Sequence, residues 1–314
     1  MKKKVQIVLA TYNGEKYIEE QINSILSQTY KNWELLIRDD GSKDNTLNII
    51  DRYIKNYPEK IFLISDNLGK LGPCYNFLNL LKLTDKDYVF FCDQDDIWSK
   101  NKLKIFVEKF IAIESKSNIP ILLHSDLVII DENKNIICDS YIKLSKINPL
   151  INKSLKKILV RNFPGCSMAI NKTLIEKLFP LPKGILMHDL WVSIIAVLLG
   201  EIHYIDEKLI YYRVHNNNTI GLGKNRGKIS FDLFTLILNF KNKKLLFWKD
   251  NLPRIEQAKI ILDNYYFIKK EDKNTLKSFL NLKSYNWIMK RIIFIRNNFL
   301  DQDLIRNIRF FLYL

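Results

Sequence analysis

The sequence predicts an α/β fold with a doubly wound, mostly parallel sheet, followed by a C-terminal helical extension. Short runs rich in β-branched residues alternate with amphipathic stretches over about the first 95 residues, and polar turns end each run. Beyond residue 227 the pattern is helical, and Pro253 is the interruption that stands out. Such alternation is typical of parallel sheets. We therefore expect a catalytic domain over 1–225 and a helical extension over 226–314.

Each element follows from its own pattern of apolar residues. In the first half, strands are expected at 5–10, 33–38, 61–64 and 88–92, and helices at 15–28, about 44–54 and 73–83. Further on, helices are expected at 100–114, 173–179 and 189–199, with strands at 121–131, 167–170 and 202–212. Segment 143–160 predicts only helical turns, and 216–218 predicts a polar loop.

Composition and charge restrict the class of protein. The 314 residues are 47% hydrophobic and 26% charged, which is typical of a globular chain and excludes general disorder. The net charge is +15, and segment 224–314 carries 19 Lys/Arg against 8 Asp/Glu. The four cysteines lack CxxC spacing and indicate reduced thiols. No run approaches the ~20 apolar residues of a membrane span. The apolar-rich run between the basic N-terminus and Tyr12 is too short for a signal-peptide core and cleavage site. We therefore expect a cytoplasmic protein.

Polar clusters end three of the predicted strands. They are Thr11-Tyr12-Asn13, Asp39-Asp40 and Asp93-Gln94-Asp95-Asp96. Ligands of open α/β sheets bind at the carboxyl ends of strands, so these clusters should meet at one crevice. Closely spaced carboxylates suit a hard divalent cation that keeps positions open for phosphates. The chain has neither a GxxxxGK[ST] loop nor a GxGxxG fingerprint, so a glycine cradle for phosphate is excluded.

These residues resemble the inverting GT-A glycosyltransferases of glycosyltransferase family two, in particular the bacterial rhamnosyltransferase-like branch. The resemblance covers about residues 5–221. The matching segments are ATYNGEKYIEEQINSILSQTY, IRDDGSKDNT, FCDQDDIWSKNKL, LLHSDLVIID, NFPGCSMAIN, HDLW and YYRVHNNN. The resemblance implies a GT-A fold, a UDP- or dTDP-sugar donor, and Mn²⁺ or Mg²⁺ as cofactor. It also implies an acceptor that is a growing cell-surface polysaccharide or a lipid-linked glycan.

The resemblance also implies a role for each matching residue. Thr11 and Tyr12 would flank the nucleotide base and Asp39 would bind its imide N–H. The implied donor-site residues are Thr11, Tyr12, Asn13, Asp39, Asp93 and Arg213, the last neutralising phosphate charge. The implied metal ligands are Asp95, Asp93 and His215, although His215 could equally contact the diphosphate.

Asp189 is the implied catalytic base. An inverting transfer is a single displacement, so it needs one base beside the incoming hydroxyl and charge stabilisation on the departing diphosphate. The alternative for Asp189 is a helix N-cap. His188 would orient Asp189 or simply pack. On the acceptor side, Trp98 would form a sugar platform or pack in the core, and Gly165 would permit a tight backbone path.

Several alternatives remain open at this point. The basic, aromatic-rich tail predicts either contact with an anionic membrane or a helical cap on the catalytic domain or a second subunit. A metal-dependent nucleotidyltransferase and a basic nucleic-acid-binding protein are the rival functions. Acidic clusters at the strand ends argue against nucleic acid as a partner, since they repel phosphate. The resemblance favours rhamnose, but related enzymes transfer other sugars. The sequence does not indicate an oligomeric state.

Overall fold

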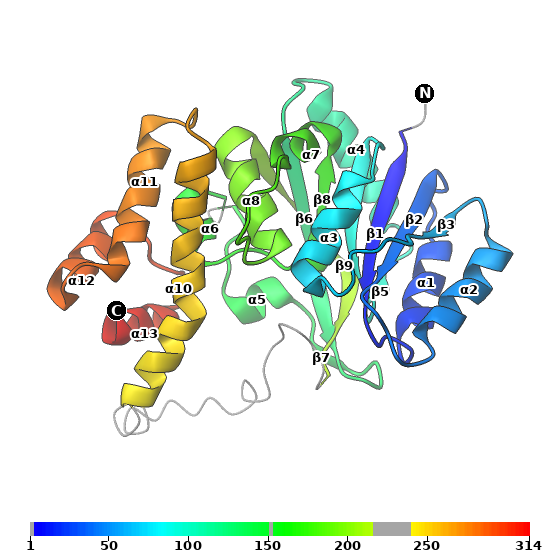
Figure 1. The fold of residues 1–314 in the computed structure, drawn as a ribbon, viewed down its shortest axis with the longest axis horizontal. Coiled ribbons are helices and arrows are strands. Elements are labelled where there is room, and N and C mark those ends of the chain that lie inside the picture. Colours follow the sequence, from blue (N-terminus) through cyan, green and yellow to red (C-terminus); the bar gives the residue numbers. More distant parts are fainter. Residues whose placement is uncertain (1–2, 151–152, 216–239) are drawn as a thin grey trace. The chain divides into compact units, whose positions relative to one another are not determined.

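The computed structural model describes residues 3–150, 153–215 and 240–314, excluding the side chains of 240–246 and 250. The predicted loop at 216–218 and the start of the predicted extension, 226–239, lie outside these residues. The chain divides into two compact units (Figure 1). The first comprises 1–144, 163–181 and 187–213, and the second comprises 145–162, 182–186 and 214–314.

The first unit contains the predicted parallel sheet. Its parallel strands are β1 (Val5–Thr11), β2 (Trp33–Asp39), β3 (Ile61–Leu63) and β4 (Tyr88–Asp93). Strand β1 pairs with β2 on one side and β4 on the other, and β3 extends the sheet from β2. The connecting helices are α1 (Ile18–Leu26), α2 (Thr46–Asn56) and α3 (Gly72–Lys82). The predicted alternation of parallel strands and helices over the first 95 residues is therefore confirmed.

The other half of the sheet mixes strand directions. The full order is β3-β2-β1-β4-β8-β6-β9-β5, and β7 pairs with β6. The added strands are β5 (Ile97–Trp98), β6 (Ile121–Ile130), β7 (Ile136–Cys138), β8 (Met168–Asn171) and β9 (Glu201–Arg213). Strand β8 runs antiparallel to β4 and β6, whereas β6 and β9 are parallel. The sequence analysis missed β5 and β7, which have two and three residues.

Helices cover both faces of the sheet, as alternating side chains of β4 show. The ring of Tyr88 stacks at 4.3 Å on Phe110 of α4 (Lys102–Glu114). The ring of Phe91 points to the opposite face, where it lies 5.8 Å from Phe77 of α3 and 5.3 Å from His188 of α8. Helix α8 spans His188–Leu199, and α7, which contacts it, spans Lys172–Leu178.

The second unit is helical. Its helices are α6 (Leu155–Val160), α10 (Phe240–Asn264), α11 (Lys270–Leu280), η3 (Asn281–Lys283), α12 (Trp287–Arg296) and α13 (Leu304–Tyr313). Short helices α5 (Tyr141–Ser145) and η1 (Gly165–Ser167) complete the fold. Helix α10 continues through Pro253, so the expected interruption there is wrong. Proline removes one backbone hydrogen bond, and this long helix accommodates the loss.

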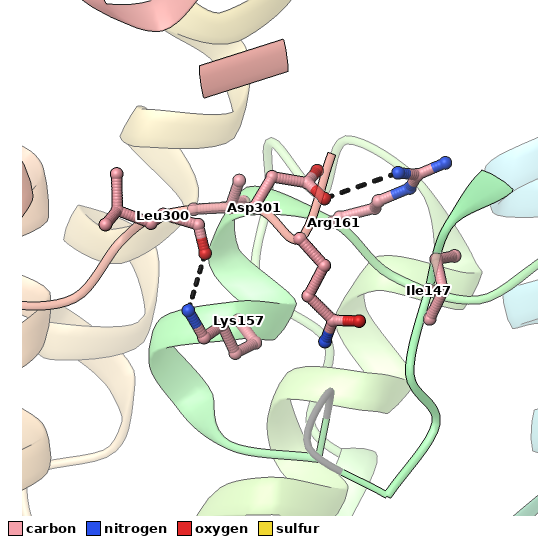
Figure 2. A pocket seen from close by; sticks show the side chains of 7 residues that line it. Ile147, Lys157, Arg161, Leu300 and Asp301 are labelled. Carbon is pink, nitrogen blue, oxygen red and sulfur yellow. Dashed lines mark hydrogen bonds and ion pairs between the residues drawn. The ribbon is translucent and has the colours of Figure 1, made fainter. Parts of the chain in front are cut away.

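Contacts far apart in sequence hold the second unit together. The Arg254 guanidinium donates to the carbonyls of Ile158 and Leu159, and the Gln257 amide donates to the carbonyl of Gly184 at 2.9 Å. Figure 2 shows a small pocket of this unit, where Arg161 pairs with Asp301 at 3.4 Å. Segments 145–162 and 182–186 therefore join the C-terminal helices, ahead of the predicted boundary at 226.

Two further expectations concern the chain as a whole. None of the four cysteines, all of which lie in the described part of the chain, forms a disulfide. None of the described helices combines the length and apolar character that crossing a membrane requires.

Candidate active site

The loop after β1 is tied to the acidic turn after β4 by one amide side chain. Gln94 accepts hydrogen bonds from the Thr11 hydroxyl at 2.6 Å and from the Tyr12 N–H at 2.9 Å. Its own amide N–H donates to the Tyr12 carbonyl at 3.2 Å. A Cβ on Gly14 would lie 2.5 Å from the Gln94 Oε1, so a larger residue there would displace the Gln94 amide from these contacts. The sequence analysis assigned Gln94 no role, because an amide between carboxylates carries no distinctive signal.

Asp39, at the end of β2, organises the neighbouring turn. Its Oδ1 accepts from the N–H groups of Gly41 at 2.9 Å and Ser42 at 2.7 Å, and its Oδ2 accepts from the Ser42 hydroxyl. Asn13 joins this turn to the β1 loop, since its N–H donates to the Ser42 hydroxyl and its amide oxygen accepts from the Lys43 N–H. A carboxylate has about four acceptor positions. The contacts with Gly41 and Ser42 use three of them, so one position of Asp39 is left for the imide of a nucleotide base. The predicted imide contact stays a prediction.

The next residue, Asp40, is neutralised by the protein itself. Its carboxylate is 4% exposed and pairs with Arg38 at 3.1 Å. It also accepts from the N–H groups of Leu71 at 2.6 Å and Gly72 at 2.8 Å, at the start of α3. Arg38 pairs with Asp66 as well, and that hydrogen bond raises the pKa of the guanidinium. Asp40 is therefore a structural residue.

The acidic turn after β4 concentrates negative charge that the protein compensates only in part. Burial, together with the charges of Asp95 and Asp189, raises the pKa of Asp93 to about 7. Burial and the charges of Asp95 and Asp93 also hold the pKa of Asp96 well above its usual range. The charge of Asp189 thus contributes to the raised pKa of Asp93, while the roles of base and metal ligand stay predictions.

One set of side chains in the described part of the chain could hold a single metal ion. It consists of Asp93, Asp96 and the Cys166 thiol, whose ligand atoms all lie within 4.8 Å of one another. The Oδ2 of Asp96 is buried without a hydrogen-bond partner among the described residues. Asp95 and His215 are outside this set, and His215 follows the end of β9 by two residues. Their metal contacts stay predictions.

A buried lysine faces the acidic turn. Lys102, the first residue of α4, is fully buried, and its ammonium donates to the Cys166 carbonyl at 2.9 Å. Burial lowers its pKa to about 8, and nearby thiols and carboxylates oppose that shift. The ammonium lies 3.6 Å from the ring centre of Trp98, which is 2% exposed. Of the two roles considered for Trp98, the structure thus favours packing over a sugar platform.

Asp189 lies at the start of α8, in its first turn. The N-cap of this helix is Met187, so the N-cap interpretation of Asp189 is wrong. Its Oδ1 accepts from the Leu190 N–H at 2.6 Å, while its backbone carbonyl accepts from the Ser193 hydroxyl. Among the described residues, Oδ2 of Asp189 accepts no hydrogen bond. One carboxylate oxygen is therefore fixed and the other is available to an incoming hydroxyl.

Gly165 packs closely against His188 and Asp189. A Cβ on Gly165 would lie 2.7 Å from His188 Nε2 and 3.5 Å from the Asp189 Cβ. Gly165 does not have a positive φ, so close packing rather than backbone freedom explains the glycine. The His188 ring is 4% exposed and lies 4.2 Å from the ring of Phe77. Burial lowers its pKa to about 4. The structure therefore favours packing as the role of His188.

Arg213, the last residue of β9, is built into the acidic turn. Its side chain is 1% exposed and its backbone N–H donates to Asp96 at 3.2 Å. The guanidinium donates to the carbonyls of Asp95 at 3.0 Å and Glu132 at 3.1 Å, and it pairs with Glu20. In this structure Arg213 therefore positions the turn. Its predicted contact with the diphosphate stays a prediction.

Comparisons with known proteins bear on the family and the fold of this chain. An uncharacterized glycosyltransferase of Nostoc sp. is 30% identical over 224 residues, which cover 68% of this chain and 66% of that protein, just under two thirds. The dTDP-rhamnosyl transferase RfbG of Shigella flexneri is 34% identical over 230 residues, covering 68% of this chain and 73% of that one. The fold is similar to TarS of S. aureus in complex with UDP-GlcNAc, with a TM-score of 0.53, 19% identity, and coverage of 94% and 89%.

The family model gives the broadest assignment. Residues 6–179, more than half of the chain, match the model described as Glycosyl transferase family 2. These residues include the β1 loop, the Asp39 turn, the acidic turn and Gly165. The chain therefore belongs to glycosyl transferase family 2, and the GT-A-like fold expected from the sequence is confirmed.

Proposed function

We propose that this glycosyltransferase transfers a sugar with inversion from a UDP- or dTDP-sugar. The acceptor is a hydroxyl of a growing cell-surface polysaccharide or of a lipid-linked oligosaccharide. The relative RfbG is named a dTDP-rhamnosyl transferase, so dTDP-rhamnose is the first donor to test. TarS was solved with UDP-GlcNAc, which supports including UDP-sugars. The observation that carries the proposal is that Gly165 packs against Asp189 while the next residue, Cys166, lies with Asp93 and Asp96 of the acidic turn.

Asp189 acts as the base in this proposal. Its oxygen that lacks a partner accepts the proton of the acceptor hydroxyl as the hydroxyl oxygen bonds to the anomeric carbon. The bond from that carbon to the nucleoside diphosphate breaks, and its electron pair leaves with the diphosphate. The Leu190 N–H fixes the other oxygen, and Gly165 allows the backbone to approach. No protein nucleophile is needed.

The acidic turn suits a divalent cation. Carboxylate oxygens are the ligands that Mn²⁺ and Mg²⁺ prefer, and the buried Oδ2 of Asp96 has no partner among the described residues. Asp95 and Asp93 would hold the ion, with His215 as a further ligand or a diphosphate contact. When bound, the ion would offset the charge of the departing diphosphate. Thr11, Tyr12 and Asn13 would border the nucleotide, and Asp39 would select its imide.

The decisive experiment separates binding from transfer. Asp189→Asn keeps the shape of the side chain but removes the base. We expect it to bind the donor as wild type does, measured by thermal stabilisation with Mn²⁺ or Mg²⁺ across a panel of nucleotide-sugars. Transfer to saccharide acceptors should fall about 10²- to 10⁴-fold. Asp51→Asn, an exposed change on α2, should retain full activity. Unchanged transfer by Asp189→Asn would exclude it as the base.

A further inference from the structure

Helix α12 turns apolar side chains toward solvent. Of its ten residues, Phe294 alone is buried. Ile288, Ile292 and Ile295 are 53%, 47% and 52% exposed. Their i, i+4, i+7 spacing places them on one face of the helix. A soluble helix normally buries such a stripe, so its exposure marks an interaction surface.

Cations border this apolar stripe. On a helical projection Arg291 lies on one side and Arg296 on the other, and the helix contains no Asp or Glu. Trp287, at the start of the helix, is 62% exposed, and the Arg291 guanidinium lies 4.6 Å from its ring centre. An apolar face with Trp and flanking Arg is typical of helices that lie in the plane of a membrane interface. There, the long cationic side chains reach the phosphates while their stems stay in apolar surroundings.

The charge distribution argues against a second copy as the occupant. A two-fold interface places the same patch on both sides. Pairing α12 with itself would bring Arg291 and Arg296 near their own copies without acidic partners from this helix. An anionic bilayer surface offers the opposite charge together with an apolar layer. Each basic residue near such a surface adds to the attraction.

We propose that α12 is an interfacial anchor for an anionic lipid bilayer. The isoleucine stripe, Ile288, Ile292 and Ile295, enters the boundary between headgroups and acyl chains, and Arg296 contacts lipid phosphates. Arg291, whose guanidinium donates to the carbonyls of Trp287 and Phe311, adds positive charge beside the stripe. Trp287 lies at the headgroup level. This inference does not depend on the chemistry of transfer, because it can be tested without donor or acceptor. It gives the protein a route to acceptors that are held in a membrane.

The experiment is vesicle flotation with the full chain, on phosphatidylcholine vesicles with and without phosphatidylglycerol. Wild type should float with the anionic vesicles only. The triple variant Ile288→Ser, Ile292→Ser, Ile295→Ser should bind them at least about tenfold more weakly. Arg296→Glu should weaken binding about tenfold. The exposed side chains make all four changes compatible with folding, which circular dichroism and nucleotide-induced stabilisation would check.

Matched controls lie in the other unit. The triple variant Ile111→Ser, Ile136→Ser, Ile137→Ser removes three isoleucines that are 45%, 63% and 59% exposed, and Lys55→Glu reverses one exposed charge on α2. Both should float as wild type does. If these controls lose binding to the same extent as the α12 variants, the anchor is not α12.

Tryptophan fluorescence supplies a second, local readout. Trp33, Trp98 and Trp191 are at most 4% exposed and Trp248 is partly buried, so a blue shift on vesicles would report on Trp287. Trp287→Phe should bind vesicles but lose the shift. Failure of wild type to bind anionic vesicles would overturn the proposal. So would a wild-type dimer that the α12 triple variant converts to a monomer, since a second copy would then cover the stripe.

Discussion

Two acidic turns flank β1 in the sheet, one after β2 and one after β4. In the first, Asp40 is satisfied by Arg38 and by two N–H groups of the α3 start. In the second, Asp93 and Asp96 have pKa values raised by burial and by neighbouring carboxylates. The difference separates an acidic turn that the protein itself neutralises from one in which neighbouring carboxylates raise each other's pKa despite the nearby Lys102. Adjacent acidic residues at the end of a strand therefore do not by themselves distinguish a structural turn from a ligand-binding turn.

The largest effect should come from breaking the satisfied turn. Asp40→Ala leaves Arg38 and two N–H groups buried with fewer partners, so we expect a loss of about 3–5 kcal/mol in the free energy of unfolding. Urea denaturation would measure it. Asp51→Ala, at an exposed position on α2, should stay within about 0.5 kcal/mol of wild type. Equal losses in both variants would mean that the Arg38 network does not stabilise the first turn.

A change in the acidic turn after β4 should instead weaken ligand binding. Asp95→Ala should weaken metal-dependent donor binding by at least about a hundredfold, because ligands and their supports dominate metal affinity. Titration calorimetry of UDP or dTDP with and without Mn²⁺ would detect the change. Metal-free stability should fall little. If Asp95→Ala destabilised the fold as strongly as Asp40→Ala, the contrast between the turns would be lost.

A smaller effect concerns pH. The pKa of Asp93 rises from 3.8 to about 7 on folding, so between these values the folded state holds a proton that the unfolded state has lost. The metal-free protein should therefore lose stability as pH rises from about 4 to about 7, and level off above. Asp93→Asn should make this slope shallower and raise Tm at pH 8 by on the order of 5 °C. Melting curves in a chelator would measure both. If the stability of Asp93→Asn fell as steeply with pH as that of wild type, groups other than Asp93 would cause the pH dependence.

Much of the fold follows from the sequence because local and tertiary preferences agree there. The strands of the parallel half are buried and continuous in apolar residues, so their pattern predicts them. Strands β5 and β7 have two and three residues, too few to form a pattern, and Ile136 and Ile137 of β7 are exposed. The grouping of 145–162 with the C-terminal helices depends on contacts such as Arg254 with Ile158, which no local signal predicts.

For the site, motif residues could be named but their partners could not. Asp39 and Asp40 are adjacent, yet only the fold determines that Asp40 pairs with Arg38 and that Asp39 accepts from the N–H of Ser42. The phosphate contact of Arg213, which the resemblance implies, stays a prediction, whereas its hydrogen bonds to the carbonyls of Asp95 and Glu132 could not be predicted. Lys102 lies on the buried face of α4 with Leu103 and Phe106. A lysine on that apolar face was the available signal for a buried cation.

The Gln94 bridge has a consequence for how ligands communicate. Because this amide bonds both the Thr11 hydroxyl and the Tyr12 backbone, the loop proposed to border the nucleotide and the turn that carries the carboxylates form one hydrogen-bonded unit. Ordering either half lowers the entropic cost of ordering the other. Nucleotide and cation should therefore bind cooperatively, and by thermodynamic reciprocity each should raise the affinity of the other by the same factor.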